Sequence, residues 1–85
     1  MDYIIQYLPR AVKQLGRLPK DIRVPIVNAI AGLSHRDHWT NVKRLTQHQY
    51  QYRLRVGNYR VLFDVEESIV TIYVCEVKKR DSQTY

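Results

Sequence analysis

The sequence has few of the residues that cross-link or interrupt a small fold. Its 85 residues include one cysteine, three glycines and three prolines. The single cysteine, Cys75, cannot form an intrachain disulfide, and we expect a reducing, cytoplasmic setting. The glycines are scattered singly, so the sequence contains no glycine-rich loop of the kind that cradles phosphates.

Long apolar runs are missing as well. No segment approaches the length of a membrane span, and the first residues lack the charged and apolar regions of a signal peptide. There is no internal repeat and no low-complexity segment. Hydrophobic residues still make up 45% of the chain, which is enough for a packed core. We therefore predict one domain over residues 1–85 and no contact with a membrane.

Metal and cofactor sites have no support in the sequence. His35 and His38 have the spacing His-x-x-His, but no cysteine or carboxylate spacing completes a zinc site. A Ser-His-Asp or Cys-His arrangement would need a histidine on a rigid element, and all three histidines fall in a predicted loop. We expect neither a metal nor a cofactor.

Positive charge is what the sequence has in excess. Fourteen lysines and arginines against eight acidic residues give a formal net charge of +6. Such a balance indicates a polyanionic partner, either nucleic acid or an acidic protein. Charge alone fits a merely soluble basic domain equally well. The clustering of the arginines is what favours a partner.

The arginines cluster in residues 52–63, Tyr-Arg-Leu-Arg-Val-Gly-Asn-Tyr-Arg-Val-Leu-Phe. Basic and apolar residues alternate on both sides of the Gly-Asn pair, which predicts a β-hairpin with a two-residue turn. The register of that hairpin places Arg55 opposite Arg60, with the apolar residues on the other face. Like charges directly opposite each other destabilise a sheet, so folding alone does not explain this pair. We predict a phosphate-binding face formed by Arg53, Arg55 and Arg60.

The rest of the chain predicts a strand, two helices, a polar basic loop and three strands. Pro9 directly follows the first strand and suits the first turn of a helix. Apolar residues then recur at helical spacing in two stretches, and β-branched residues dominate the last strand. The predicted ranges are 2–8, 9–18, 21–33, 34–49, 50–56, 59–66 and 69–77, with the last turn at residues 67–68.

The order βααβββ predicts an α+β domain, with a helical hairpin packed on one face of a small antiparallel sheet. The uncovered face would carry the arginines. On the last strand, strict alternation places Val70, Ile72 and Val74 under the helices and Tyr73, Cys75 and Val77 on the arginine face. The segment Lys78-Lys79-Arg80 adds three cations where that strand ends.

Over essentially its whole length, the chain resembles the RelE/ParE superfamily of toxins from bacterial toxin–antitoxin pairs. The specific part is the hairpin segment 52–60, followed by a strand and then by Lys-Lys-Arg before Tyr85. Lys43 and Leu45 also resemble the segment just before the hairpin. The closer resemblance is to the RelE-like branch. It implies a RelE-like fold and a ribosome-dependent endoribonuclease, an mRNA interferase that cuts messenger RNA in the ribosomal A site.

The resemblance also assigns candidate catalytic residues. The RelE-like branch uses two basic residues two positions apart, a third on the next strand, and a basic residue followed by tyrosine near the end. The matching residues are Arg53, Arg55, Arg60, Arg80 and Tyr85, with Lys79 as an alternative to Arg80. RelE itself has lysines at the first two positions. Guanidinium keeps its proton near neutrality, so the arginines here can hold charge but should not shuttle protons.

The implied reaction is attack of a ribose 2′-hydroxyl on the adjacent phosphodiester, which leaves a 2′,3′-cyclic phosphate and a 5′-hydroxyl. The three arginines would stabilise the negative charge. Tyr85 would be the base, and Lys79 or Arg80 the acid. Further contacts with RNA are expected from Lys43, Arg44, Tyr73 and Lys78.

The implied partners are a cognate antitoxin, the ribosome and messenger RNA, with operator DNA bound only by the toxin–antitoxin complex. Two alternatives remain open. One is a ParE-like toxin, which has the same fold and inhibits DNA gyrase without catalysis. The other is a basic RNA-binding module without activity, for which the arginine face alone would suffice.

Overall fold

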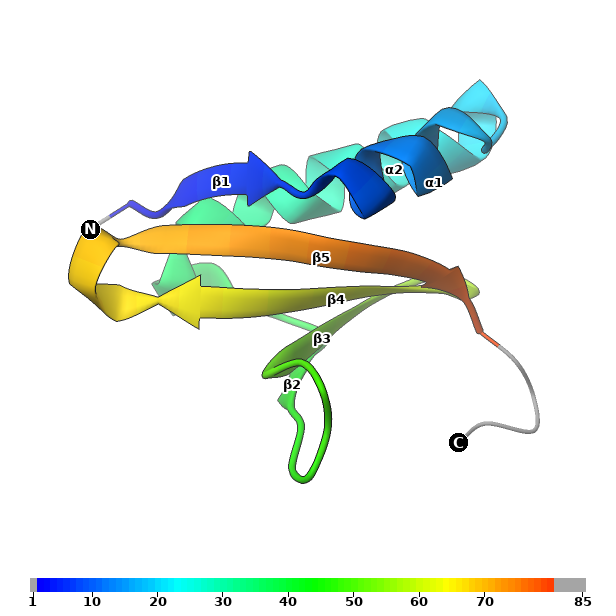
Figure 1. The fold of residues 1–85 in the computed structure, drawn as a ribbon. Coiled ribbons are helices and arrows are strands. Elements are labelled where there is room, and N and C mark those ends of the chain that lie inside the picture. The colour runs from blue at the N-terminus through cyan, green and yellow to red at the C-terminus, as the bar shows by residue number, and fades with distance from the viewer. Residues whose placement is uncertain (1, 81–85) are drawn as a thin grey trace.

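A five-stranded mixed sheet with two helices on one face makes up residues 2–80, the part of the chain that the computed structural model describes (Figure 1). The strand order is β1-β5-β4-β3-β2. The strands are β1 (Ile4–Tyr7), β2 (Val42–Arg44), β3 (Tyr52–Val56), β4 (Tyr59–Glu66) and β5 (Thr71–Lys79). The helices are α1 (Pro9–Gly16) and α2 (Lys20–Ala31), with short 3-10 helices η1 (Gly32–Ser34), η2 (Arg36–His38) and η3 (Glu67–Ile69). The predicted α+β fold is confirmed.

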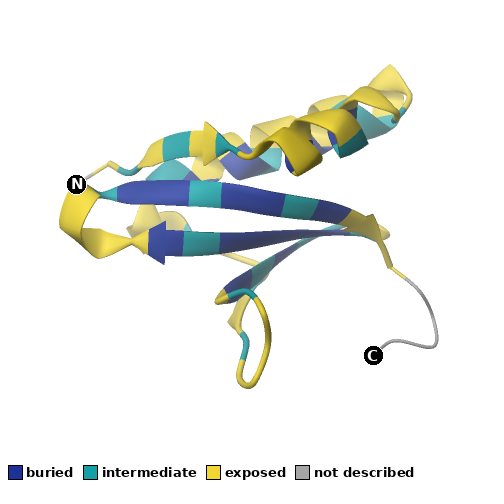
Figure 2. Cartoon of the chain, in the orientation of Figure 1, coloured by how far each residue is buried: buried dark blue, intermediate teal, exposed yellow. Residues whose placement is uncertain are grey.

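Both helices bury an apolar stripe against the same side of the sheet. Pro9 occupies the first position of α1, where its missing N–H costs nothing, and Ala11 and Leu15 are buried one turn apart. In α2 the buried residues are Ile26 and Ile30, again four positions apart. Figure 2 shows the result, with exposed outer faces on the helices and long buried stretches on β4 and β5.

An aromatic cluster closes one end of the core. The Trp39 ring meets Tyr52 and Phe63 edge-on, with centroid distances of 5.4 and 5.6 Å, while Tyr52 stacks on Phe63 at 5.3 Å. The Trp39 indole donates a hydrogen bond of 2.8 Å to the carbonyl of Leu33 at the end of the helical layer. Edge-to-face and offset-stacked rings are the favourable arrangements. This cluster therefore fixes the segment after α2 against the β3–β4 hairpin.

The β3–β4 hairpin has the predicted register. Its opposed pairs include Val56–Tyr59, Arg55–Arg60 and Arg53–Leu62. Gly57 adopts a φ of +56°, and positive φ at the first central residue is what a type II′ turn requires. Leu54, Val61 and Phe63 belong to the buried core. Because side chains alternate along a strand, the three arginines lie on the opposite face of the sheet.

Two parts of the sheet differ from the prediction. β1 pairs parallel with β5, so the sheet is mixed rather than antiparallel. No tight turn joins β1 to its neighbour, and the sequence pattern therefore does not specify its direction. β2 lies inside the segment that we predict as loop. Three residues are too few for an alternating pattern to reveal a strand.

The start of β5 also differs. Residues 67–69 form η3 instead of a two-residue turn, and Val70 follows with a φ of +50°. Val70 is therefore part of the turn and not of the strand. A β-branched residue with positive φ is unusual, and it is not what the sequence pattern predicts.

A β-bulge in β5 changes which of its residues face the helices. Phe63 pairs with Val74, whereas Leu62 pairs with Glu76, so Cys75 is an extra residue on β5. Beyond the bulge the alternation is shifted by one position. Val77 lies opposite Val61 and belongs to the core, so its prediction on the arginine face is wrong.

Candidate functional site

Basic residues from four strands gather on the sheet face that the helices leave uncovered. We call this the basic face, and its members are Lys43, Arg53, Arg55, Arg60 and Lys78. Lys43 lies opposite Arg53, and Arg60 lies between Arg55 and Lys78 in adjacent strands. Figure 1 shows α1 and α2 on the other side of the sheet. The predicted arginine cluster is therefore present and extended by two lysines.

Arg60 is the central and most deeply buried member of the basic face. It is only 4% exposed, although it carries a full positive charge between two other cations. Two unit charges ~5 Å apart repel by about 3 kcal/mol at an effective dielectric constant of ~20. The Nε atom of Arg55 is also buried, and within residues 2–80 it has no hydrogen-bond partner. Such an arrangement concentrates positive potential at one point of the surface.

The loop between β2 and β3, residues 45–51, forms a wall beside the basic face. The backbone N–H of Gln51 donates to Asp64 Oδ1 at 2.8 Å, and the N–H of Val65 donates to Gln51 Oε1 at 2.7 Å. A further bond from the Leu45 N–H to the Gln51 carbonyl, 2.8 Å long, closes the loop. Figure 1 shows the loop projecting from the sheet on the side away from the helices. The bonds to β4 hold this wall in place.

One carboxylate lies among the cations. Glu76 is opposite Leu62, and its side chain is only 12% exposed. Its Oε1 atom is 3.8 Å from the Lys78 ammonium and 3.9 Å from the guanidinium of Arg10 on α1. Tyr50, at the end of the loop wall, hydrogen-bonds to the Glu76 carboxylate. Burial, followed by the charge of Glu76, raises the pKa of the Tyr50 phenol. Tyr50 therefore keeps its proton at neutral pH.

Cys75 is not available as a nucleophile. Burial, followed by the charge of Asp64, raises the pKa of its thiol to about 11. Its Sγ atom lies 3.8 Å from Asp64 Oδ2 and 3.3 Å from the Tyr73 carbonyl. Within residues 2–80, no three histidine, cysteine or acidic side chains are close enough together to hold a metal ion.

Several other predicted site residues lie away from the cluster. Arg44 is opposite Tyr52; its guanidinium donates to the Tyr52 hydroxyl at 3.0 Å and lies over that ring, so it is not on the basic face. Lys79 is opposite Tyr59 and therefore shares the face of the hairpin that packs against the helices. Tyr73 lies opposite Asp64, on the basic side of the sheet but towards the other end of β5.

The end of the chain is only partly described. The Arg80 N–H donates to the carbonyl of Asn58, which places this exposed residue beside the hairpin turn. Tyr85, the predicted base, lies outside the described residues. Sequence reasoning did not single out Glu76 or Tyr50. The one available signal was the spacing of Glu76 two positions before Lys78, which puts both on the same face of a strand.

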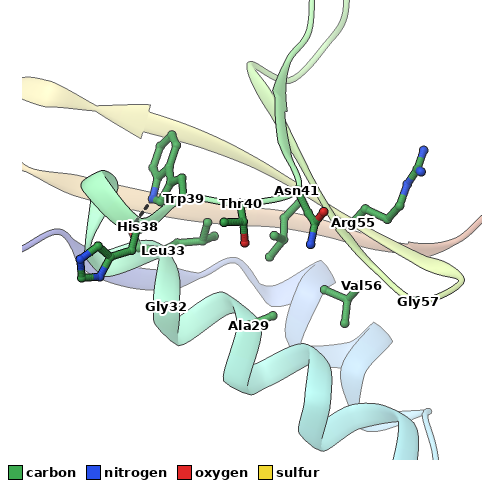
Figure 3. Close-up of a pocket in the computed structure, with 11 residues that line it drawn as sticks. Ala29, Gly32, Leu33, His38, Trp39, Thr40, Asn41, Arg55, Val56 and Gly57 are labelled. Carbon is green, nitrogen blue, oxygen red and sulfur yellow. Dashed lines mark hydrogen bonds between the residues drawn. The ribbon is translucent and has the colours of Figure 1, made fainter.

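A hollow of about 390 Å³ lies between α2 and the edge of β3, beyond the end of β2 (Figure 3). Ala29, Leu33, Trp39 and Val56 contribute much of its apolar lining. Figure 3 shows Val56 pointing towards α2 and Arg55 pointing away from it. The hollow therefore lies on the helix side of β3, and Arg55 borders it although its side chain points away from α2.

Solved structures of other proteins have a similar fold over nearly the whole chain. The sequence matches no family model and no curated protein. The structure is similar to that of the archaeal RelE–RelB complex from Pyrococcus horikoshii OT3, with a TM-score of 0.79 and 25% identity over 96% of this chain and 99% of that chain. It is also similar to the RelBE2 toxin–antitoxin complex from Mycobacterium tuberculosis, with a TM-score of 0.79 and 23% identity over 94% of this chain and 100% of that one.

A third similar structure is the isolated RelE toxin of E. coli, with a TM-score of 0.79 and 18% identity over 96% of this chain and 88% of that chain. These alignments cover nearly all of the chain, so they include both the helical layer and the basic face. The resemblance drawn from the hairpin and the basic segment is confirmed, and the chain has the fold of the RelE toxins.

Proposed function

We propose that this protein is the toxin of a toxin–antitoxin pair and that it cuts messenger RNA on the ribosome. The observation that carries the proposal is the basic face. Arg60 is buried between Arg55 and Lys78, and a bound anion would offset the repulsion between like charges that lie opposite each other in the sheet. The RelE fold provides the context, because basic side chains in this position suit the backbone of an RNA substrate.

The chemistry of the basic face fits stabilisation of a phosphodiester transition state. When a 2′-hydroxyl attacks the adjacent phosphate, additional negative charge develops on the non-bridging oxygens. Arg53, Arg55 and Arg60 can each donate two hydrogen bonds to such oxygens. Donors that are already in position stabilise developing charge without reorganisation. Lys43 and Lys78 add charge at either end of the cluster, where the RNA backbone would continue.

The candidate acid and base come from the resemblance and from the register of β5. The resemblance implies Tyr85 as the base and Lys79 or Arg80 as the acid. The register of β5 favours Lys78 over Lys79, because Lys78 is the lysine that lies opposite Arg60. An enzyme with weak acid–base groups would depend on the ribosome to hold the message in a reactive geometry.

We also propose a cognate antitoxin as partner. The similar structures from P. horikoshii and M. tuberculosis are complexes of RelE with RelB. A net charge of +6 makes an acidic partner segment electrostatically favourable. We expect toxicity on induced expression, and we expect co-expression of a small adjacent reading frame to suppress it. Toxicity that no adjacent gene product suppresses would contradict this part of the proposal.

The test of catalysis uses ribosomes programmed with a defined codon in the A site. Arg60→Met keeps most of the side-chain volume and removes the central charge. We expect it to lower the single-turnover cleavage rate by about 10²–10³-fold, the usual cost of losing one donor to developing negative charge. Arg17→Met removes the same charge from an exposed position after α1, and it should cleave at nearly the wild-type rate.

Two results would overturn the proposal. One is a wild-type protein that leaves ribosome-bound message intact, whether or not it inhibits DNA gyrase. The other is an Arg60→Met variant that cleaves as fast as wild type. Circular dichroism of each variant separates loss of catalysis from loss of folding.

A further inference from the structure

We propose that Glu76 and Lys78 are the acid–base pair of the cleavage reaction. Glu76 takes the proton of the attacking 2′-hydroxyl, and Lys78 gives a proton to the departing 5′-oxygen. This inference rests on the proposed function and names residues that the family resemblance does not supply.

A proton acceptor is needed because the arginines of the basic face cannot provide one. Among residues 2–80, the strand carboxylates on this side of the sheet are Asp64, Glu66 and Glu76. Glu66 lies opposite Thr71 at the far end of β4 and accepts a hydrogen bond of 2.7 Å from the Ser68 hydroxyl. Asp64 is already engaged, since its Oδ1 accepts the Gln51 N–H at 2.8 Å and so holds the loop wall. Glu76 is held more loosely. The two cations next to it, on Lys78 and Arg10, are 3.8 and 3.9 Å away.

These distances matter because charge-assisted hydrogen bonds are about 2.7–2.9 Å long. At 3.8 Å or more, these two cations lie beside the Glu76 carboxylate without hydrogen-bonding to it, and the hydrogen bond from the Tyr50 phenol takes one of its roughly four lone-pair sites. The carboxylate can therefore still accept a proton from a substrate. The neighbouring phenol of Tyr50 does not compete for that role, because burial and the charge of Glu76 raise its pKa and keep it protonated.

The position of the pair relative to Arg60 follows from the register. Lys78 is directly opposite Arg60, and Glu76 is two residues earlier on the same face of β5. Adjacent strands are about 4.8 Å apart, so a phosphate held by Arg60 lies within reach of both side chains. The Lys78 side chain is 51% exposed, which leaves its ammonium free to move from Glu76 to the substrate.

The bulge at Cys75 is what creates this arrangement. Without the extra residue, Val77 and Lys79 would share the face of Arg60, and Glu76 and Lys78 would point towards the helices. Because of the bulge, Glu76 and Lys78 lie on the basic face instead, so this face carries one carboxylate and one ammonium. Bulges are frequent next to active sites because they redirect side chains.

Protons and electrons balance in this cleavage step. The O2′–P bond forms as the 2′-hydroxyl proton passes to the Glu76 carboxylate. The P–O5′ bond breaks as the Lys78 ammonium protonates the leaving oxygen. The products are a 2′,3′-cyclic phosphate and a 5′-hydroxyl, with a neutral carboxylic acid and a neutral amine on the protein. Transfer of one proton from Glu76 to Lys78 restores the starting state without another reactant.

The experiment compares Glu76→Gln and Lys78→Met on programmed ribosomes with two messages. One message is ordinary RNA, and the other has sulfur in place of the 5′-bridging oxygen at the cleaved bond. A thiolate leaves without protonation. We expect both variants to cut ordinary RNA about 10²–10⁴-fold more slowly than wild type, the usual contribution of a general acid or base. The sulfur message should restore the rate of Lys78→Met and leave Glu76→Gln slow.

Binding is measured with a message that carries 2′-deoxyribose at the cleaved position and cannot react. Binding of Glu76→Gln should stay within about threefold of wild type, since a group that acts only on the moving proton contributes little to ground-state affinity. Two matched controls accompany it. Arg10→Met removes the tether between α1 and Glu76, and Lys13→Met removes a charge from an exposed position of α1. Both should cut at nearly the wild-type rate.

The outcomes distinguish this inference from the proposed function. If wild type does not cut, both fall. If wild type cuts and Glu76→Gln cuts equally fast, or Arg10→Met loses as much rate as Glu76→Gln, the carboxylate is at most structural and the inference falls alone. A Lys78→Met variant that sulfur does not rescue also overturns it. That last test remains decisive even if Glu76→Gln does not fold.

Discussion

Replacing Arg55 by methionine should stabilise the fold while it weakens anion binding. Arg55 is directly opposite Arg60, and its buried Nε has no hydrogen-bond partner in the described part of the chain. Repulsion between two charges ~5 Å apart ranges from about 1 kcal/mol in water to about 3 kcal/mol at a dielectric constant of ~20. Methionine retains most of the apolar stem, so little packing is lost. We expect the free energy of unfolding to rise by about 1 kcal/mol, the upper end for opposed pairs in sheets.

Thermal unfolding at low salt, followed by circular dichroism, measures this change. A gain of about 1 kcal/mol corresponds to an increase in Tm of roughly 4–8 °C for a domain of this size. Lys13→Met removes a cation from an exposed position of α1 and serves as the control, with an expected change within about 0.5 kcal/mol. Inorganic phosphate should stabilise wild type more than Arg55→Met, because only the native basic face binds it. A destabilised Arg55→Met, or equal stabilisation of both proteins by phosphate, would refute the reasoning.

Two further predictions concern the core and the thiol. Trp39→Phe removes the indole hydrogen bond to the Leu33 carbonyl and part of a ring packed on the hairpin, so urea denaturation should show a loss of about 1–2 kcal/mol. A Trp39→Phe variant as stable as wild type would mean that the cluster is not needed. For Cys75, whose pKa is raised from 9.0 to about 11, the native state favours the protonated thiol. Its contribution to stability is fully present below pH 9 and is lost as the pH rises through about 11. Alkylation by iodoacetamide at pH 8 should accordingly be far slower in the folded protein than in urea, and equal rates would contradict the burial of the thiol.

The β3–β4 hairpin could be predicted from the sequence because a two-residue turn leaves only one register. With Gly57 and Asn58 fixed as the turn, the pairing of Arg55 with Arg60 follows by counting. The helices could be predicted for a similar reason, since their apolar residues recur at helical spacing. In both cases local pattern and tertiary packing agree.

The parts that could not be predicted depend on contacts far apart in the sequence. β2 is a strand only because Lys43 and its neighbours pair with the edge of β3. The bulge at Cys75 could not be predicted either, because the sequence also fits a regular strand with Val74 under the helices and Val77 on the other face. The role proposed for Glu76 follows from that bulge. In the sequence it is one acidic residue in a basic segment, which usually means a solvated charge.

The parallel pairing of β1 with β5 has a consequence for when the sheet is completed. Ile4 lies beside Thr71, so two strands more than sixty residues apart in the sequence pair with each other. β5 also lies between β1 and β4, and it carries Lys78. Pairings this distant in sequence close late, after most of the chain is available. A nascent chain therefore lacks a complete sheet and a complete basic face until β5 has left the ribosome.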